Sequence, residues 1–431
     1  MANGLIIAAP SSGSGKTLIT MGLLGALKKR GISVASAKTG PDYIDASFHA
    51  LATNISATNL DPWAMSPNQL RARAATAAGQ NDLLIIEGVM GLFDGAVSGN
   101  GSTADLAAAL DLPVVLVVDV GSMAQSIAAM VHGFSTLRSD INVVGVILNR
   151  VASERHEAML KAALEGLDIG YLGALGRDND LAIPSRHLGL TLPEDFDAAQ
   201  KVAAAAIERV ETRLNLDQLS DLASPIDKNA QSKCLPPLGQ KIAIAKDQAF
   251  AFIYPHLLAD WRGAGAQLSF FSPLADEAPS PEAGAIFLPG GYPELHGKVL
   301  ANASVFRSGM KDAADAGKLI YGECGGYMVL GQSITDKSGE TNSMLGLLPH
   351  STSIDKPRRQ LGYRQLTHNS PLPFPQKLCG HEFHYSTQHG TIGETLFAAK
   401  DAQGTELPPM GCVIGNVMGS YAHIIDQRAD D

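Results

Sequence analysis

Short hydrophobic runs alternate with helix-like segments through the first 150 residues of the chain. The runs cover residues 5–9, 34–37, 83–86, 114–118 and 143–148. A strand that is apolar along its whole length is buried on both faces, and such strands belong to parallel sheets with helices on each side. The pattern therefore predicts an α/β fold built on a parallel sheet.

A second alternation of the same kind begins after a stretch without apolar periodicity. A helical pattern over residues 197–222 leads into residues 223–240, which hold three prolines and several Ser, Asn and Gln side chains. Hydrophobic runs then return at residues 242–245, 268–271, 285–288 and 319–321. We predict an N-terminal domain over residues 1–222, a linker over 223–240 and a C-terminal α/β domain over 241–431.

The composition is typical of a soluble globular protein and argues against some classes of binding partner. The 431 residues are 45% hydrophobic and 18% charged, which suits two domains with large cores. The formal net charge of -10 argues against general binding to nucleic acid or to anionic membranes. Four widely spaced cysteines without a C-x-x-C pair favour neither a zinc site nor disulfides. We expect a cytoplasmic protein, since the apolar run at residues 112–120 is too short to span a bilayer.

A glycine-rich segment between the first strand and the first helix has the pattern of a phosphate-binding loop. Its small residues let backbone N–H groups approach phosphates, Lys16 can reach the outer phosphates and Thr17 can hold magnesium. The motif G-x-x-x-x-G-K-[ST] has Pro10 in place of its first glycine. Asn149, after the run at 143–148, either reads the adenine edge or simply ends its strand. The predicted ATP-binding residues are Gly13, Ser14, Gly15, Lys16, Thr17 and Asn149.

Four acidic residues lie in loops after these strands, at the expected carboxyl edge of the sheet. They are Asp42, Asp45, Glu87 and Asp94. Carboxylates beside a phosphate-binding loop hold Mg²⁺ and support phosphoryl transfer, although a single loop carboxylate is usually only solvated. We assign Thr17, Asp45 and Glu87 to the metal. We assign Asp42 and Asp94 to phosphoryl transfer or to substrate.

A cysteine stands between an apolar strand and an apolar helix in the segment Tyr-Gly-Glu-Cys-Gly-Gly at residues 321–326. Such a corner exposes a nucleophile, and the N–H of Gly325 can face a developing oxyanion. The helix N-terminus is expected to lower the pKa of the Cys324 thiol. An ordinary buried cysteine is the alternative, and the flanking glycines argue against it.

Two further segments of the second half supply partners for this cysteine. His423, in Gly-Ser-Tyr-Ala-His, is the candidate base that activates the thiol. Gly290 and Gly291 follow the run at 285–288 and can bring a second backbone N–H to an oxyanion, unless they form only a strand-ending turn. Together these residues indicate acyl chemistry at Cys324.

Seven motifs spread along the chain are familiar in combination. They are KTGPDYID from Lys38, EGVMGLFDG from Glu87, PSRHLGL from Pro184, LPGGYPEL from Leu288, YGECGGY from Tyr321, GHEFHYS from Gly380 and GSYAH from Gly419. Together with the phosphate-binding loop they resemble the cobyrinic acid a,c-diamide synthases, including the hydrogenobyrinic acid enzymes of the aerobic cobalamin route. The resemblance covers nearly the whole chain. It implies a dethiobiotin-synthetase-like P-loop domain followed by a class I glutamine-amidotransferase-like α/β domain.

This resemblance implies amidation of the a and c acetate side chains of a corrin, with ATP, Mg²⁺ and glutamine. ATP would convert a carboxylate into an acyl phosphate, and ammonia released from glutamine would displace the phosphate. Cys324 would form a thioester with glutamine, and His423 would act as base and acid. The best-known amidotransferase triads end in a glutamate two residues after the histidine, where this chain has Ile425. Asp426 is one position off and is left unassigned.

An anionic corrin requires local cations on an acidic protein. Arg186, His187 and Arg364 are the candidates, because they lie in the motif PSRHLGL and in the segment LGYR. The segment at 381–385, His-Glu-Phe-His-Tyr, lacks the histidine spacing of a zinc site. We expect a structural, interdomain or substrate-contact role for it.

The sequence alone is also compatible with other functions. A related enzyme could amidate a nickel-containing tetrapyrrole of the nickel-sirohydrochlorin type, or act on different corrin side chains as cobyric acid synthases do. A P-loop switch ATPase, which uses nucleotide to control dimerisation, would have no chemistry at Cys324. The oligomeric state is open as well, with a homodimer as one option.

Overall fold

The structure is a computed structural model that describes residues 2–177, 185–186, 189–190, 199–231, 233–390 and 393–428. The chain divides into two compact units, Met1–Lys233 and Cys234–Asp431. Each unit has its own sheets and its own hydrophobic core. Among the described helices, none is both long enough and apolar enough to cross a membrane.

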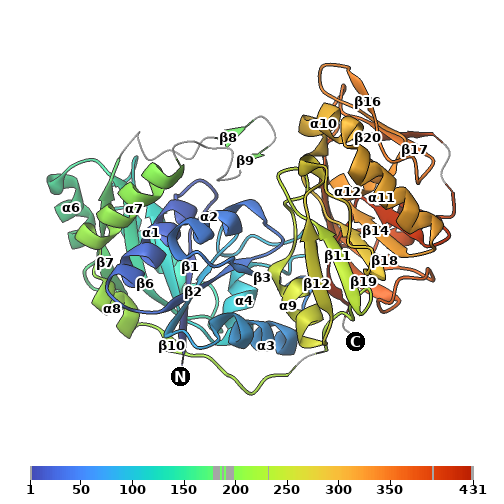
Figure 1. The fold of residues 1–431 in the computed structure, drawn as a ribbon. Coiled ribbons are helices and arrows are strands. Elements are labelled where there is room, and N and C mark those ends of the chain that lie inside the picture. Colours follow the sequence, from blue (N-terminus) through green and yellow to red (C-terminus); the bar gives the residue numbers. More distant parts are fainter. Residues whose placement is uncertain are drawn as a thin grey trace. The chain divides into compact units, whose positions relative to one another are not determined.

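An eight-stranded sheet forms the centre of the first unit (Figure 1). Its order is β3-β2-β4-β1-β5-β6-β7, all parallel, with β10 paired antiparallel to β1. The central strands are buried along almost their whole length, as their apolar sequences predict. The strands are β1 (Asn3–Ala8), β2 (Val34–Thr39), β3 (Thr58–Leu60), β4 (Leu83–Glu87), β5 (Val114–Asp119), β6 (Val143–Val151), β7 (Gly170–Gly176) and β10 (Ser224–Pro225). The expected parallel α/β fold is confirmed.

Helices α1, α7 and α8 share one hydrophobic core with this sheet. Glycines allow α1 and α7 to pack closely: a Cβ at Gly22 would lie 2.6 Å from Val210 Cγ2, and one at Gly25 only 2.3 Å from Ile207 Cδ1. This contact packs the middle of α1 against α7. The helices of this unit are α1 (Lys16–Lys29), α2 (Ile44–Thr53), α3 (Pro67–Ala78), α4 (Thr103–Leu110), α5 (Ile127–Thr136), α6 (Glu154–Leu164), α7 (Ala199–Arg213) and α8 (Leu216–Asp221).

The helical pattern at residues 197–222 forms two helices in its described part. Asn215 separates them, because its side chain accepts a hydrogen bond from the Gln218 N–H at 3.1 Å and so caps α8. β10 then pairs with β1. The segment at 223–240 therefore begins inside the sheet of the first unit.

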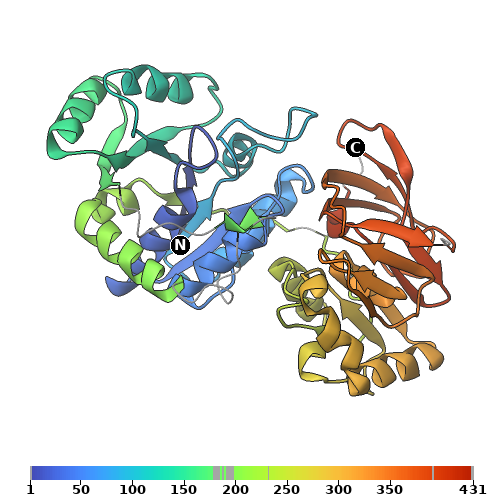
Figure 2. The ribbon, with the colours of Figure 1, turned by 90° about the horizontal axis from the view of Figure 1, so that it is seen from above.

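The second unit, coloured yellow to red in Figure 2, is built on a six-stranded sheet. The order of its strands is β12-β11-β13-β14-β24-β23. Neighbouring strands in this sheet are parallel, except that β23 runs antiparallel to β24. The strands are β11 (Lys241–Ala245), β12 (Gln267–Phe271), β13 (Ala285–Leu288), β14 (Leu319–Glu323), β23 (Cys412–Ile414) and β24 (Val417–Ser420). The helices are α9 (Pro255–Gly263), α10 (Gly297–Asn302), α11 (Ser304–Asp315) and α12 (Gly325–Leu330).

Two smaller sheets complete the second unit. A five-stranded antiparallel sheet has the order β22-β21-β18-β19-β25, and a four-stranded sheet has the order β16-β15-β17-β20. Their strands are β15 (Ser333–Thr335), β16 (Thr341–Ser343), β17 (His350–Ser353), β18 (Gln360–Thr367), β19 (Lys377–His384), β20 (Thr387–Gly390), β21 (Phe397–Lys400), β22 (Glu406–Met410) and β25 (His423–Gln427). Strand β25 follows β24 almost directly, so the chain passes from the parallel sheet into the antiparallel one at residues 421–422.

Candidate functional site

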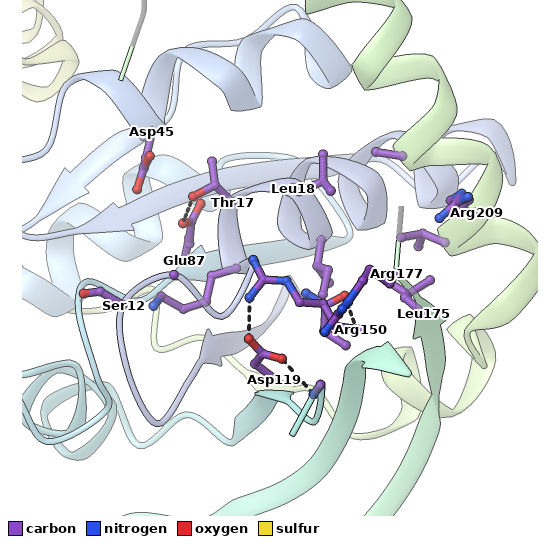
Figure 3. Close-up of a pocket in the computed structure, with 18 of the residues that line it drawn as sticks. Ser12, Thr17, Leu18, Asp45, Glu87, Asp119, Arg150, Leu175, Arg177 and Arg209 are labelled. Atoms are coloured by element: carbon purple, nitrogen blue, oxygen red, sulfur yellow. Dashed lines mark hydrogen bonds and ion pairs between the residues drawn. The ribbon is translucent and has the colours of Figure 1, made fainter. Parts of the chain in front are cut away.

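A cavity of about 890 Å³ lies at the carboxyl edge of the first unit's sheet (Figure 3). The phosphate-binding loop, residues at or just after the ends of the central strands, and part of α7 line it. Open α/β sheets bind their ligands at this edge. The cavity is therefore the candidate nucleotide site.

The phosphate-binding loop turns through two glycines before α1 begins at Lys16. Gly13 has a φ of 79° and Gly15 a φ of 93°, a region that favours glycine. Asn149 braces the turn, since its Nδ2 donates to the Ser14 carbonyl at 2.8 Å and lies 2.3 Å from where a Gly15 Cβ would be. The first N–H groups of α1 are thereby held at the cavity, where they can bind phosphate.

Lys38 is a buried cation in the cavity wall that the sequence pattern did not reveal. Its Nζ lies 2.7 Å from Asp45 Oδ2 and 2.9 Å from Glu87 Oε1, and it donates to the Gly88 carbonyl at 3.2 Å. Only 1% of its side chain is exposed. Burial opposes the charge, but Glu87 and Asp45 raise the pKa of Lys38 above its ordinary value. The ammonium is therefore a fixed positive charge.

Glu87 binds three partners in the same cluster. Oε1 accepts a hydrogen bond from the Thr17 hydroxyl at 2.7 Å as well as contacting Lys38, while Oε2 lies 2.6 Å from His49 Nε2. Although burial opposes ionisation, Lys38 and His49 hold the pKa of Glu87 well below its usual value. His49 is completely buried in α2 and was not expected at this site. Glu87 is thus an ionised carboxylate with a fixed orientation.

The predicted magnesium ligands Thr17, Asp45 and Glu87 come together around Lys38. Asp45 Oδ1 is buried and has no hydrogen-bond partner among the described residues. No group of three or more His, Cys, Asp or Glu side chains in the described part of the chain could hold a metal alone. Mg²⁺ at phosphate sites uses one or two carboxylates and takes its other ligands from phosphates and water. These side chains therefore fit a magnesium ion that binds together with a nucleotide.

The other two predicted acidic residues have different surroundings. Asp42 lines the cavity, and its Oδ1 accepts hydrogen bonds from the N–H groups of Ile44 and Asp45 at 2.8 and 3.0 Å. Burial and the charge of Asp45 raise the pKa of Asp42 to about 7. Asp94 accepts a hydrogen bond from the Gly91 N–H at 2.9 Å and closes its own turn. It is not among the residues that line the cavity.

Three arginines, Arg150, Arg177 and Arg209, also line the cavity and were not expected (Figure 3). Arg150 has a positive φ of 61° and pairs with Asp119. Asn149 lies beside them, and its Oδ1 accepts a hydrogen bond from the Arg150 N–H at 2.9 Å. Both ends of the Asn149 amide thus have partners within the protein, and its contact with adenine stays a prediction.

The second unit contains the cysteine corner that the sequence predicts. Cys324 stands between β14 and α12 with φ 47° and ψ -107°, a strained conformation typical of a nucleophile on a sharp turn. A Cβ at Gly326 would lie 1.9 Å from the Leu288 carbonyl oxygen, and one at Gly325 would lie 3.0 Å from Gly291 N. Only glycines permit this close approach, so the expected strand, turn and helix are confirmed.

His423 is brought to this corner by the pairing of β24 with β14. Glu323 lies opposite Ser420 in that pair, and the Cys324 N–H donates to the Ser420 carbonyl at 2.8 Å. A Cβ at Gly290 would lie 3.2 Å from His423 Nε2 and 3.3 Å from Cys324 Cβ. The nucleophile, the base and Gly290 therefore meet at one point.

The protonation of this pair differs from the expectation. Burial, followed by the charge of Glu294, raises the pKa of the Cys324 thiol well above its usual range. Burial and the neighbouring His381 and His384 lower the pKa of His423 to about 3. The prediction that the helix N-terminus favours a thiolate is wrong for this structure, because α12 has only six residues and burial outweighs its dipole. Both groups are neutral at rest.

Glu323, directly before the cysteine, is a further titratable group at the corner. Its Oε2 lies 3.7 Å from His423 Nδ1, and its Oε1 accepts hydrogen bonds from the Ile424 N–H at 3.1 Å and the Tyr321 hydroxyl at 3.2 Å. Burial raises the pKa of Glu323 to about 8. A glutamate at the end of an apolar strand could have pointed to this residue in the sequence. The sequence did not show that His423 lies beside it.

The predicted corrin-binding cations are described only in part. Arg186 is described as part of the backbone of β8 (Ser185–Arg186), which pairs with β9 (Gly189–Leu190), and His187 lies outside the described residues. Arg364 is 8% exposed, with Nε and Nη2 each 2.7 Å from Glu382 Oε2. Glu382 Oε1 lies 2.7 Å from His384 Nε2. Glu382 thus holds the Arg364 guanidinium in a buried network, and a contact of Arg364 with a corrin carboxylate stays a prediction.

Comparison with known proteins agrees with the two sites. Residues 5–190 match the family model of the CobQ/CobB/MinD/ParA nucleotide binding domain, and residues 241–430 match that of the CobB/CobQ-like glutamine amidotransferase domain. These matches confirm the predicted P-loop and amidotransferase-like folds.

Curated relatives match over nearly the whole length. The hydrogenobyrinate a,c-diamide synthase of Rhizobium meliloti is 50% identical, with 98% of this chain and 99% of the relative covered. The enzyme of the same name from Brucella abortus is 50% identical, with 98% of each chain covered, and that of Mesorhizobium japonicum is 46% identical over the same shares. This chain belongs to the hydrogenobyrinate a,c-diamide synthase family.

Proposed function

We propose that this protein uses ATP and glutamine to amidate the a and c acetate carboxylates of a corrin, hydrogenobyrinic acid or cobyrinic acid, in cobalamin biosynthesis. The observation that carries the proposal is the presence of two different sites in one chain. A phosphate-binding cavity with a fixed cation and ionised carboxylate suits carboxylate activation. A buried Cys324–His423 pair suits the release of ammonia from glutamine.

In the second unit, the thiol of Cys324 attacks the amide carbon of glutamine. Because both Cys324 and His423 are neutral at rest, His423 Nε2 takes the thiol proton during the attack and then gives it to the departing ammonia. The N–H of Gly325 and an N–H of Gly290 or Gly291 are proposed to stabilise the oxyanion. Water then hydrolyses the thioester and releases glutamate.

In the first unit, a corrin carboxylate attacks the terminal phosphorus of ATP and gives an acyl phosphate and ADP. Ammonia then displaces phosphate and forms the amide. Lys16 and the N–H groups at the start of α1 bind the phosphates, and Lys38 places a second positive charge beside them. Thr17, Asp45 and Glu87 would hold Mg²⁺, which neutralises phosphate charge when bound.

The corrin must be recognised outside these two catalytic clusters. Its carboxylates are anionic, so we propose that Arg186 and His187 contact them, as the motif PSRHLGL suggests. Asp42, with its pKa raised to about 7, is proposed to lie near the reacting carboxylate, where a neutral acid repels an anion less. A cytoplasmic location is part of the proposal, supported by four cysteines that are widely spaced along the chain.

The test supplies hydrogenobyrinic acid and cobyrinic acid separately to the purified protein with ATP, Mg²⁺ and glutamine. Mass spectrometry counts how many acids become amides. Two conversions are expected on at least one corrin, with ADP and glutamate formed in equal amounts to the amide. ATP turnover without any amide would favour the switch ATPase. A nickel tetrapyrrole is supplied in a third reaction, and its conversion without conversion of either corrin would show that the substrate is not a corrin.

Gly290→Ala should disable glutamine use while leaving the ammonium-dependent reaction intact. The added Cβ would lie 2.3 Å from His423 Cε1, so the imidazole must move away from the thiol. A displacement of about 1 Å costs about 10²-fold in rate, and we expect at least that loss in glutamine-dependent amidation. Gly284→Ala is the matched control, because the atom nearest to its Cβ is 4.0 Å away. Normal glutamine use in Gly290→Ala would contradict the assigned geometry.

Asp45→Asn should weaken the dependence of turnover on magnesium. The change removes charge from the carboxylate whose Oδ1 is buried without a partner among the described residues. We expect the Mg²⁺ concentration for half-maximal amidation to rise about 10–100-fold, as for other lost ligand contacts. Asp217→Asn serves as the control, since Asp217 is an exposed residue of α8 that does not line the cavity. An unchanged magnesium titration in Asp45→Asn would reject the metal role.

A further inference from the structure

The two ring nitrogens of His423 face different groups. Nε2 lies on the side of Gly290 and Cys324, since a Cβ at Gly290 would be 3.2 Å from Nε2 and 3.3 Å from Cys324 Cβ. Nδ1 lies on the side of Glu323, whose Oε2 is 3.7 Å away. An imidazole placed in this way has a nucleophile on one side and a carboxylate on the other, as in nucleophile–base–acid triads.

The carboxylate of Glu323 is held in place independently of the histidine. The side chain is 3% exposed, and Oε1 accepts hydrogen bonds from the Ile424 N–H and the Tyr321 hydroxyl. The Tyr321 ring is itself fixed by stacking on Phe287, with ring centroids 5.8 Å apart. With Oε1 occupied in this way, Oε2 is the oxygen that lies beside His423.

We propose that Glu323 is the positioning residue of the glutaminase and accepts a hydrogen bond from His423 Nδ1–H. This bond keeps the proton on Nδ1, so that Nε2 has a free lone pair for the proton of Cys324. It also stabilises the imidazolium that forms when the thiol is deprotonated. The inference rests on the proposed glutaminase function, and it gives a triad in the chain order Glu323, Cys324, His423.

The separation of 3.7 Å is longer than a hydrogen bond and must shorten by about 0.5–1 Å to become one. Catalytic hydrogen bonds are often long in ligand-free structures and tighten when substrate binds. Both side chains project from neighbouring backbone segments that are already joined, because Glu323 Oε1 accepts from Ile424, the residue after His423. A small side-chain rotation is therefore sufficient.

The strand β25 that carries His423 holds one other carboxylate, Asp426. Ile425 occupies the position of the usual glutamate, and its side chain is hydrocarbon. Asp426 follows a bulge in β25, since Ile424 lies opposite Gly380 and Asp426 lies opposite Cys379. The Oδ1 of Asp426 accepts a hydrogen bond from the Gln427 N–H, whereas Glu323 Oε2 lies 3.7 Å from His423 Nδ1.

Glu323→Gln is the decisive variant. The amide keeps an acceptor for Ile424 and Tyr321 but presents N–H donors to His423, which forces Nδ1 to accept and places the ring proton on Nε2. The comparable change in a serine protease triad costs about 10⁴-fold, and we expect kcat for glutamine hydrolysis to fall about 10²–10⁴-fold with KM little changed. Amidation supported by added ammonium should continue at the rate of the unaltered protein.

Asp426→Asn is the matched control, because it removes a buried carboxylate from the same strand as His423. It should retain glutamine hydrolysis. If Glu323→Gln hydrolyses glutamine at the unaltered rate, or if Asp426→Asn shows the large loss instead, the inference fails. If the unaltered protein hydrolyses no glutamine, the proposed function fails, which is a distinguishable result.

A measurement on the unaltered protein tests the inference even if the Glu323→Gln variant does not fold. Nitrogen chemical shifts of ¹⁵N-histidine-labelled protein, assigned with His423→Gln, report which ring nitrogen carries the proton. Burial raises the pKa of Glu323 to about 8, so the spectra are recorded at a higher pH, where the ionised carboxylate can accept a hydrogen bond. Among the described residues, Tyr321, His423 and Cys324 are titratable groups close enough to act on this carboxylate. A proton on Nδ1 is expected, and a proton on Nε2 would overturn the inference.

Discussion

Cys324→Ala is expected to abolish amidation with glutamine and to spare amidation with ammonium. The thiol is the only group at the corner of β14 and α12 that can form the thioester, so its loss should lower glutamine-dependent turnover about 10⁶-fold, as for other removed nucleophiles. Free ammonia needs no thioester and reacts directly with the acyl phosphate. Amide formation counted by mass spectrometry, with each nitrogen source in turn, gives both rates from one preparation.

Cys234→Ala is the matched control for this experiment, because Cys234 is an exposed cysteine in the same unit. It should use both nitrogen sources normally. A folded Cys324→Ala protein that also loses the ammonium-dependent reaction would show that the two reactions do not use separate sites. Retained glutamine use would remove Cys324 from the mechanism.

The fold was predictable because its signals are local and continuous. Residues 83–86 and 114–118 are apolar throughout, and they form the buried central strands β4 and β5. The phosphate-binding loop is likewise a single segment, whose glycines are required by their positive φ values. The turn at Cys324 is also local, since the glycines around it are required by close backbone contacts.

The charge cluster was not predictable because it depends on which strands become neighbours. Lys38 and Glu87 lie opposite each other in the β2–β4 pair, although β3 comes between these strands in the sequence. His49 reaches Glu87 from α2, through packing that no local pattern encodes. A lysine at the end of an apolar strand was visible in the sequence, but its burial was not.

The protonation of the cysteine corner was mispredicted for a related reason. The sequence shows a helix after Cys324, and a helix N-terminus lowers the pKa of a thiol. It does not show that Cys324 is only 5% exposed, and burial acts in the opposite direction. The direction of the pKa shift was decided by tertiary burial, which sequence alone does not give.

Lys38→Met is expected to abolish amidation with either nitrogen source. Methionine has a similar length but no charge, so the phosphoryl group loses a fixed cation and Glu87 and Asp45 lose the ammonium between them. Removing a cation that stabilises a transferring phosphoryl group costs about 10³–10⁵-fold, and we expect a loss in that range. Ammonium-dependent amidation measures it without the glutaminase step.

Two controls separate this catalytic role from an effect on folding. Lys29→Met makes the same change at an exposed lysine that pairs with Glu211, and an exposed pair contributes at most about 1 kcal/mol, so this variant should be fully active. The double variant Lys38→Met with Glu87→Gln removes one charge of each sign and should recover thermal stability lost in Lys38→Met, because no unpaired charge is then buried at Glu87. It should remain inactive, since the cation is still absent. Turnover in either Lys38 variant near that of the unaltered protein would show that Lys38 only stabilises the fold.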